Sequence, residues 1–312
     1  MTNISDYDRL NYDYSQYWKE RLYENLAEKN LLNKIFERKR GNWFLDIGGS
    51  YGRITSTYYN SYKYPVILDY SLNTLVKNKE VIKSRYPKIT LIAANAYKMP
   101  FKESSFDAGL MVRVLHHIEE PEKYFKEARR VFTKEATYVQ EFANKVHIKA
   151  KTRALFRKDF DFFSEEPYEQ PIGKNLEGSK KEEGGIFLNY HPLHIKRLLE
   201  KNKFYIEKKF GCSFLRSQAI KKLLGTDLMI FIEKILQKTL SWSNIPPSIF
   251  FETTLEKKPL EKEREQSSKL RDILACPSCK GNLTFDGDDD AKCKKCNLEF
   301  SKKDDIWDFR IE

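Results

Sequence analysis

The residues best placed to do chemistry in this chain surround a glycine-rich turn. An apolar run from Phe44 to Arg53, with the sequence FLDIGGSYGR, ends in an acid and the turn, and a second apolar run ends in Asp69. Glycine lets a backbone pass close to a ligand, and a carboxylate at the tip of a strand can accept hydrogen bonds from both hydroxyls of a ribose. The two runs therefore predict a site for an adenosine derivative.

The spacing of the glycines indicates which derivative binds. A dinucleotide-binding turn reads G-x-G-x-x-G, and its helix N-terminus meets a pyrophosphate. Here Gly48, Gly49 and Gly52 stand at relative positions one, two and five, and Asp46 precedes them. That acid would repel a pyrophosphate but would attract the sulfonium and ammonium charges of S-adenosylmethionine. We therefore expect S-adenosylmethionine rather than NAD.

A second chemical pattern lies near the end of the chain. Two C-x-x-C pairs contain four of the five cysteines: Cys276, Cys279, Cys293 and Cys296. Four thiolates at this spacing can close a tetrahedral shell around a structural Zn²⁺, and Gly281 would relieve the tight turn after the first pair. Two disulfides are the alternative, but they are rare in intracellular proteins, whose thiols are kept reduced. The fifth cysteine, Cys212, is expected to be a small buried apolar side chain.

The elements that must position these residues can be predicted from hydrophobic runs. Ser71 is a plausible helix N-cap, and Pro121 is a plausible first residue of another helix. Helices that alternate with short apolar strands indicate a doubly wound α/β fold with a parallel sheet. The expected strands cover residues 42–47, 65–69, 89–94, 106–111 and 137–142, with a sixth and a seventh at 204–210 and 248–255.

The chain divides into four expected parts. Residues 1–40 would form an N-terminal helical lid, and residues 41–255 the sheet domain. A basic and aromatic insertion at about 145–190 would cap the substrate site, although an ordinary long loop fits the pattern equally well. Residues 256–272 read as a charged linker, across which few core contacts should pass. Residues 273–312 are too few for an unaided core, so a metal would stabilise them.

Composition limits the partners less sharply. The chain has 312 residues, no run of eighteen apolar residues and no secretion signal at its start, so we expect a soluble, cytoplasmic protein without a transmembrane segment. The net charge of +11 is compatible with a polyanionic partner such as RNA. An AT-rich genome would also produce surplus lysine, which usually only solvates a surface.

Roughly from Trp43 to Asn144, the chain resembles the class I S-adenosylmethionine-dependent methyltransferases, in the methyltransferase type 11-like subgroup. It keeps Asp46, Gly48, Gly52 and Arg53 of a first motif like D-x-G-x-G-x-G-R, but has Ser50 where glycine is more usual. The resemblance continues through NAYKMPF at 95–101, SFD at 105–107 and VLHHI at 114–118. It implies a seven-stranded Rossmann-like sheet whose last strand is antiparallel, and a turn shifted at the serine.

The resemblance also implies a set of cofactor contacts. The family usually has an aspartate after the third strand, which accepts a hydrogen bond from the adenine amino group; here Asn95 can accept the same bond. The leading segment folds over the cofactor in the family, which makes Tyr17 and Arg21 candidates to close the pocket. The complete set of candidates is Asp46, Gly48, Gly49, Gly52, Arg53, Asp69, Tyr70, Asn95, Ala96, Tyr17 and Arg21.

Methyl transfer itself demands little from the protein. The methyl carbon is already activated by the sulfonium, so alignment and exclusion of water supply most of the effect. A base is needed only when the nucleophile is an unactivated hydroxyl or an acidic carbon. His117, after the fourth strand, and Glu141, at the end of the fifth, are candidate bases, while Arg113 could hold an acceptor's carboxylate or phosphate. In many family members the equivalent histidine only packs.

The C-terminal segment resembles the zinc-ribbon modules found beside methyltransferases, including small activator proteins that partner tRNA and translation-factor methylators. We expect an enzyme that methylates a small molecule or an RNA, with the ribbon stabilising the catalytic domain or gripping the substrate. The basic charge favours RNA, whereas the aromatic insertion favours an apolar ligand. The alternative is a catalytically weak cofactor-binding scaffold whose ribbon recruits a protein or RNA partner. Intact Asp46, Gly48, Gly52 and Asp69 favour the enzyme.

Overall fold

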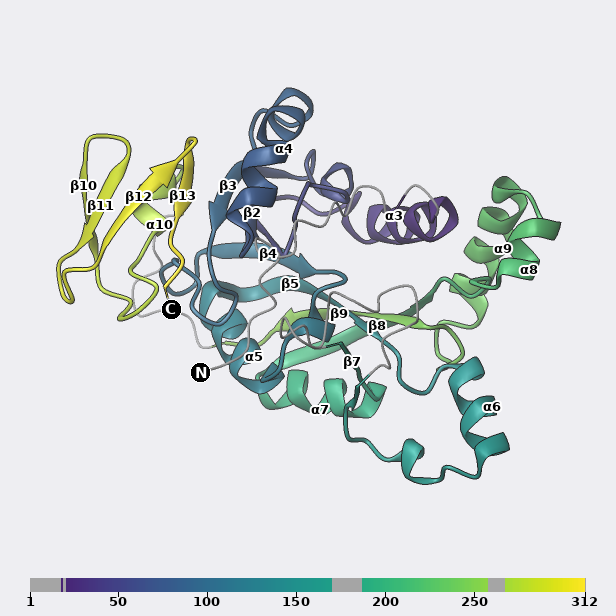
Figure 1. Cartoon of the computed structure of the whole chain (residues 1–312). Helices are drawn as coiled ribbons and strands as arrows, with labels where there is room; N and C mark the ends of the chain where they lie inside the picture. Colours follow the sequence, from purple (N-terminus) through teal and green to yellow (C-terminus); the bar gives the residue numbers. More distant parts are fainter. Residues whose placement is uncertain (1–17, 19–20, 170–186, 258–266, 312) are drawn as a thin grey trace.

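A computed structural model describes residues 18, 21–169, 187–257 and 267–311 of the chain (Figure 1). Its centre is a twisted sheet in which five strands run parallel in the order β3-β2-β1-β4-β5. β9 then pairs antiparallel with β5, and β8 pairs antiparallel with β9. The doubly wound sheet and its antiparallel last strand are thus confirmed. The strands are β1 (Gly41–Ile47), β2 (Tyr62–Asp69), β3 (Thr90–Ala93), β4 (Phe106–Met111), β5 (Phe132–Ala143), β8 (Phe204–Cys212) and β9 (Ser248–Leu255).

Helices cover both faces of this sheet because neighbouring residues of each strand point to opposite sides. In β1, Leu45 belongs to the apolar core shared with α5 (Pro121–Val131) and α7 (Pro192–Lys201). Phe44 belongs to the core shared with α3 (Leu22–Phe36), α4 (Leu72–Arg85) and α9 (Thr226–Thr239).

The two predicted helix starts are observed. Ser71 caps α4, since its Oγ accepts the Thr74 N–H at 3.1 Å, and Pro121 begins α5. Among the described residues, no helix is both long enough and apolar enough to cross a lipid bilayer.

The segment after β5 contains more regular structure than a simple loop. It includes α6 (Ile148–Arg157), the 3₁₀ turn η3 (Asp161–Phe163) and a two-stranded ribbon of β6 (Tyr168–Glu169) and β7 (Leu188–Asn189). The Tyr190 hydroxyl donates to the carbonyl of Ile118 at 2.7 Å, which ties the end of this insertion to the segment after β4. The Gly, Lys and Glu stretch at 171–185 lies outside the described residues. The role of the insertion as a substrate cap stays a prediction.

The cysteine-rich segment forms an antiparallel meander that joins the central sheet. Its strands are β10 (Leu283–Asp286), β11 (Asp290–Cys293), β12 (Glu299–Lys303) and β13 (Ile306–Asp308), and the short helix α10 (Leu270–Ile273) precedes them. β13 pairs in parallel with β3, so one sheet of eleven strands runs through both parts.

This junction corrects two expectations. The seven expected strands are all present, but they do not end the sheet, and the expectation that few core contacts cross between the two parts is wrong. An edge strand carries unpaired backbone groups that favour a further strand, and β13 covers those of β3. The indole N–H of Trp43 in β1 also donates to the carbonyl of Ser267 at 2.7 Å.

Candidate active site and metal centre

The glycine-rich turn lies at the carboxyl edge of the sheet, between β1 and the 3₁₀ turn η1 (Thr55–Thr57). Gly48 has φ of 74°, and a Cβ there would come within 2.3 Å of Val114 Cγ2, so only glycine fits. Ser50 also adopts the left-handed region, with φ of 49°, and its N–H donates to Asp69 Oδ2 at 2.8 Å. The turn therefore stays closed, with a serine in a conformation that glycine adopts more easily.

Asp69 ends β2 and is held by backbone groups on both sides. Oδ2 accepts the Ser50 N–H, and Oδ1 accepts the Ser71 N–H at 2.9 Å. These two hydrogen bonds orient the carboxylate at the tip of β2. The next residue, Tyr70, has its ring 5.9 Å from the guanidinium carbon of Arg310, which follows β13.

Asp46 lies buried beneath the turn. Its Oδ2 accepts the Tyr58 hydroxyl at 2.7 Å, while burial raises the pKa of Asp46 to about 7. A Cβ on Gly49 would approach Asp46 Cγ at 2.9 Å, so glycine is what allows the turn to pass over this acid. Close to neutral pH the carboxyl is poised between its two states, and a nearby cation would favour the ionised one.

The segment after β3 carries the two candidates for the adenine side. Asn95 is buried, and its Oδ1 accepts the Tyr97 N–H at 2.9 Å. Ala96 packs against the core at a partly buried position. The Asn95 oxygen can accept one further hydrogen bond, as the proposed adenine contact requires.

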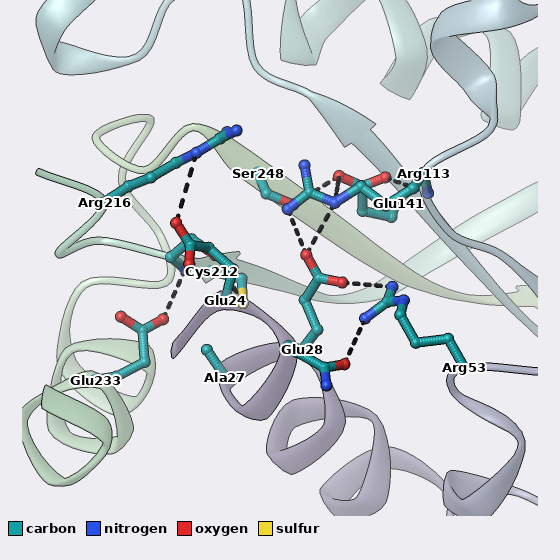
Figure 2. A network of polar contacts seen from close by, with 12 residues as sticks. Glu24, Ala27, Glu28, Arg53, Arg113, Glu141, Cys212, Arg216, Glu233 and Ser248 are labelled. Atoms are coloured by element: carbon teal, nitrogen blue, oxygen red, sulfur yellow. Dashed lines mark hydrogen bonds and ion pairs between the residues drawn. The ribbon is translucent and has the colours of Figure 1, made fainter. Parts of the chain in front are cut away.

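Two arginines from separate segments converge on one glutamate of α3 (Figure 2). Arg53 Nη2 donates to Glu28 Oε2 at 2.7 Å, and Arg113 Nε donates to Glu28 Oε1 at 2.8 Å. Glu28 is fully buried. Burial alone would raise the pKa of its carboxyl, but Arg113 and Arg53 hold it below the usual range. The Trp18 ring covers Arg53, whose guanidinium carbon lies 3.7 Å from the ring centroid.

Sequence reasoning missed Glu28, because a glutamate in a helix usually faces water. The signal that could have found it is its spacing. Glu28 lies four residues after Glu24 and between the buried Ala27 and Leu31, and thus on the apolar face of α3. Glu24 is likewise buried and pairs with Lys221 of α8 (Gln218–Leu223), whose Nζ lies 2.6 Å from Glu24 Oε1.

The structure brings Arg113 and Glu141 together. The Arg113 N–H donates to Glu141 Oε2 at 2.8 Å, and the Ser248 hydroxyl donates to Glu141 Oε1 at 2.7 Å (Figure 2). Burial raises the pKa of Glu141, while Arg113 acts in the opposite direction. Arg113 has φ of 63°, a strained value that these contacts help to hold. The pair therefore forms one network with Glu28 and Arg53.

His117 lies in the 3₁₀ turn η2 (Leu115–His117), after β4. Its ring centroid is 4.0 Å from that of His116 and 4.6 Å from that of Phe187, at the end of the insertion. Burial lowers the pKa of His116 well below its usual range. The insertion thus reaches the histidine pair, as a substrate cap would require.

The lid candidates are only partly described. Tyr17 lies outside the described residues, and Arg21 stands just before α3, where its carbonyl accepts the Asn25 N–H at 2.9 Å. The Arg21 N–H donates to the carbonyl of Trp18 at 3.2 Å, so Arg21 is one turn away from the ring that covers Arg53.

The four cysteines of the ribbon form one cluster. All are free thiols, and their sulfurs lie within 4.8 Å of one another. The Sγ atoms of Cys276 and Cys296 are 3.5 Å apart, and those of Cys279 and Cys293 are 3.4 Å apart. A tetrahedral Zn²⁺ with ordinary bonds to sulfur would place its ligands about 3.8 Å apart. The donor set therefore fits such an ion with only small adjustments.

The two cysteine pairs are built alike. The Lys280 N–H donates to the carbonyl of Cys276 at 2.9 Å, and the Asn297 N–H donates to that of Cys293 at 3.1 Å. Lys280 and Asn297 have φ of 58° and 59°, so each pair ends in the same left-handed turn. A Cβ on Gly281 would lie 3.2 Å from two of the sulfurs, which explains a glycine there.

The ribbon also holds the segment that carries Asn95 and Ala96. The Ala275 N–H donates to the carbonyl of Pro100 at 3.0 Å, and the Lys102 N–H donates to that of Ile273 at 2.7 Å. Glu127 of α5 accepts both the Met99 N–H and Lys280 Nζ at 2.7 Å. One buried carboxylate thus joins the candidate cofactor loop, residues 95–101, to the cysteine pair.

Comparison with known proteins agrees with this geometry. Residues 45–139 match the family described as "Methyltransferase domain". An uncharacterized protein of Methanocaldococcus jannaschii, MJ0638, is 34% identical over 120 residues, which are 38% of this chain and 48% of that protein. A demethylmenaquinone methyltransferase of Renibacterium salmoninarum is 35% identical over 91 residues, 29% of this chain and 37% of that protein. The chain thus spans half or less of the length of these relatives.

A shorter relative and two solved structures also match the chain. A UPF0434 protein of Dechloromonas aromatica is 48% identical over 40 residues, 12% of this chain and 69% of that protein. A SAM-dependent methyltransferase of Thermotoga maritima, described as a possible histamine N-methyltransferase, shares the fold, with a TM-score of 0.51, 16% identity and coverage of 80% of this chain and 98% of that one. A complex of the Haloferax volcanii Trm112 methyltransferase activator and a methyltransferase has a TM-score of 0.53 and 9% identity, with coverage of 81% of this chain and 99% of that one.

Proposed function

Because this chain carries a methyltransferase domain of the S-adenosylmethionine-dependent family and a segment of the UPF0434 family, we propose that it transfers a methyl group to a small-molecule or RNA acceptor. The observation that carries the proposal is the closed turn, in which the Ser50 N–H orients Asp69 while Asp46 lies buried below. A carboxylate held in a fixed orientation at the tip of β2 is what a ribose requires.

Each side chain of the site then has a role. Asp69 would accept the ribose hydroxyls, Asn95 the adenine amino group, and Asp46 would favour the cationic methionine end by charge. When bound, S-adenosylmethionine supplies a methyl group already activated by its sulfonium. Arg113, already paired with Glu28, is assigned to ordering the site rather than to holding an acceptor anion. His117 would accept a proton from acceptors that need a base.

Glu141 is the weaker candidate for such a base. Its two oxygens accept hydrogen bonds from the Arg113 N–H and the Ser248 hydroxyl, and both donors favour the ionised carboxylate. A base that must bind a proton would lose part of that stabilisation. We therefore assign Glu141 to positioning the Arg113 backbone.

We further propose that the four cysteines bind one structural Zn²⁺, and that the ribbon acts on the methyltransferase domain within the same chain. A closed shell of four thiolates leaves no position for a substrate. The hydrogen bonds from Ala275 and Lys102 across the junction, and the shared Glu127, support the second step. A neighbour in fold that was solved with a methyltransferase activator is consistent with a ribbon that supports a cofactor loop.

Two measurements test the function. Calorimetry should show one site per chain for S-adenosylhomocysteine. A protein that binds NAD but does not bind S-adenosylhomocysteine would overturn the assignment. Incubation with labelled S-adenosylmethionine and total cell extract, followed by separation into RNA, protein and organic-soluble fractions, should label one fraction. Label in RNA or in the organic phase would identify the acceptor class, whereas cofactor binding without transfer to any fraction would favour the scaffold.

A further inference from the structure

The exposed apolar side chains are concentrated in two segments. Of the sixteen large hydrophobic residues that are exposed among the described residues, eleven lie between 148 and 168 or between 223 and 245. The most exposed are Phe156 at 90%, Leu223 at 83% and Trp242 at 78%. Single exposed apolar residues are ordinary, but a concentration of this size indicates a contact surface.

In α6 the exposed apolar residues lie opposite the residues that pack on the protein. Ala150 and Ala154 are buried, whereas Ile148, Leu155 and Phe156 point away and are about half exposed or more. The helix contains no acid. The basic side chains that flank this apolar face are Lys149, Lys151, Arg153 and Arg157.

The helix α9 repeats the arrangement. Met229, Glu233 and Gln237 are buried, and they recur at every fourth position. The opposite face exposes Leu228, Phe231 and Ile235 at the spacing i, i+3, i+7, next to Lys234 and Lys238. Each helix thus exposes apolar side chains flanked by cations on the side that faces water.

The two segments adjoin where α6 begins, and we call the surface that they present together the α6–α9 face. The Ile148 N–H donates to the carbonyl of Ile245 at 3.1 Å, and Asn144 Nδ2 donates to that of Pro246 at 2.8 Å. α6 follows the carboxyl end of β5, and α8 and α9 follow that of β8, which runs in the same direction. Figure 1 shows α6, α8 and α9 at the end of the molecule opposite the ribbon.

We propose that the α6–α9 face docks on the surface of an anionic lipid bilayer. A helix that presents Phe, Trp, Leu or Ile between lysines and arginines inserts its apolar face among acyl chains, while its cations meet headgroup phosphates. The four cations of α6 without an acid provide the charge complementarity.

Other occupants fit the face less well. In a symmetric dimer the basic α6 helices would lie in one interface and repel each other. RNA is recognised by stacking on aromatic rings, but six of the eleven exposed residues are Leu or Ile. A bilayer accepts aliphatic and aromatic side chains alike.

The docked orientation has a consequence that rests on the proposed function. The glycine-rich turn and Asp69 lie at the same carboxyl edge of the sheet from which α6 and α8 leave. Docking would therefore bring the proposed active site towards a lipid-embedded acceptor.

Sedimentation with vesicles tests the docking without any use of activity. The full-length protein should sediment with vesicles of phosphatidylcholine mixed with phosphatidylglycerol, and much less with phosphatidylcholine alone or at high salt. The double variant Phe156→Ser, Trp242→Ser should weaken sedimentation about tenfold or more. Val81→Ser in α4, a residue 53% exposed, is the matched control and should leave it unchanged.

A charge pair of variants separates the two components of binding. Lys149→Gln, Arg157→Gln should reduce sedimentation with anionic vesicles, whereas Lys294→Gln, Lys295→Gln in the ribbon should not. Equal loss in both, or none in either, would overturn the proposal, as would self-association or RNA binding that depends on Phe156 and Trp242 in place of vesicle binding. Retained S-adenosylhomocysteine binding in every variant shows that the fold is intact and that the proposed function stands independently.

Discussion

The cysteine cluster and the network around the buried Glu28 are assembled over different ranges of the chain. The four sulfurs come from residues 276–296, and hydrogen bonds within the same segment shape both turns. The network instead brings together Glu28 from α3, Arg53 from the turn, Arg113 from the segment after β4 and Glu141 from β5. A local site can form with its metal alone, whereas a distributed site requires the whole fold. The pairing of β13 with β3 predicts that the second depends on the first.

Removal of the metal is the strongest test of that dependence. Cys293→Ser, or chelation, should unfold the ribbon, because the ligand shell supplies most of its folding free energy. Since the ribbon holds the loop at 95–101, the affinity for S-adenosylhomocysteine should also fall about tenfold or more. Elemental analysis and calorimetry measure both, with the exposed Ser278→Ala as control. Absence of zinc from protein purified without chelator, or full affinity after its removal, would separate the two regions.

The buried Glu28 should have the next largest effect. Glu28→Gln leaves two arginines facing each other without their carboxylate, and breaking a buried ion pair in this way costs about 3–5 kcal/mol. Urea unfolding should show this loss, whereas the exposed Glu37→Gln should change little. A loss below 1 kcal/mol would show that water or neighbouring groups replace the carboxylate and that the network does not hold the site together.

His117 tests whether the distributed site does proton chemistry. For an acceptor that needs a base, His117→Ala should lower turnover about 10²-fold while cofactor affinity stays nearly intact. Steady-state kinetics with calorimetry separates the two effects. Unchanged turnover would assign His117 a structural role, such as its packing against His116 and Phe187.

Asp69 probes the cofactor contact most directly. Asp69→Ala removes the proposed ribose bonds and the acceptor of the Ser50 N–H, so affinity for S-adenosylhomocysteine should fall by about 1–3 kcal/mol. Asp107→Ala is a suitable control, because Asp107 accepts backbone N–H groups of Asn42 and Trp43 at the opposite end of β1. Equal losses in both variants would indicate a general effect on the fold.

The sequence predicted what was local and missed what was distant. The strands, the capping Ser71 and the four cysteines follow from spacing within short segments, and the structure has all of them. Glu28 could not be assigned, because its partners Arg53 and Arg113 become neighbours only when α3 packs on the sheet. The pairing of β13 with β3 was missed for a similar reason. The strand has only three residues, Ile306–Asp308, and so short a sequence does not indicate which strand it will pair with.

The last prediction concerns Asp46 and pH. Burial raises the pKa of Asp46 to about 7 from an ordinary value near 3.8, so between these values the folded protein binds more protons than the unfolded chain. Its contribution is therefore fully present below the unfolded value and is lost as pH rises towards 7, by about 1 kcal/mol per pH unit. Asp46→Asn should remove this slope in urea unfolding without ligand, and it should make the unliganded protein more stable above pH 7. A cationic ligand reverses the preference, because its charge favours the carboxylate. S-adenosylmethionine should accordingly bind more weakly to Asp46→Asn, while a slope that persists in the variant would assign it to another group.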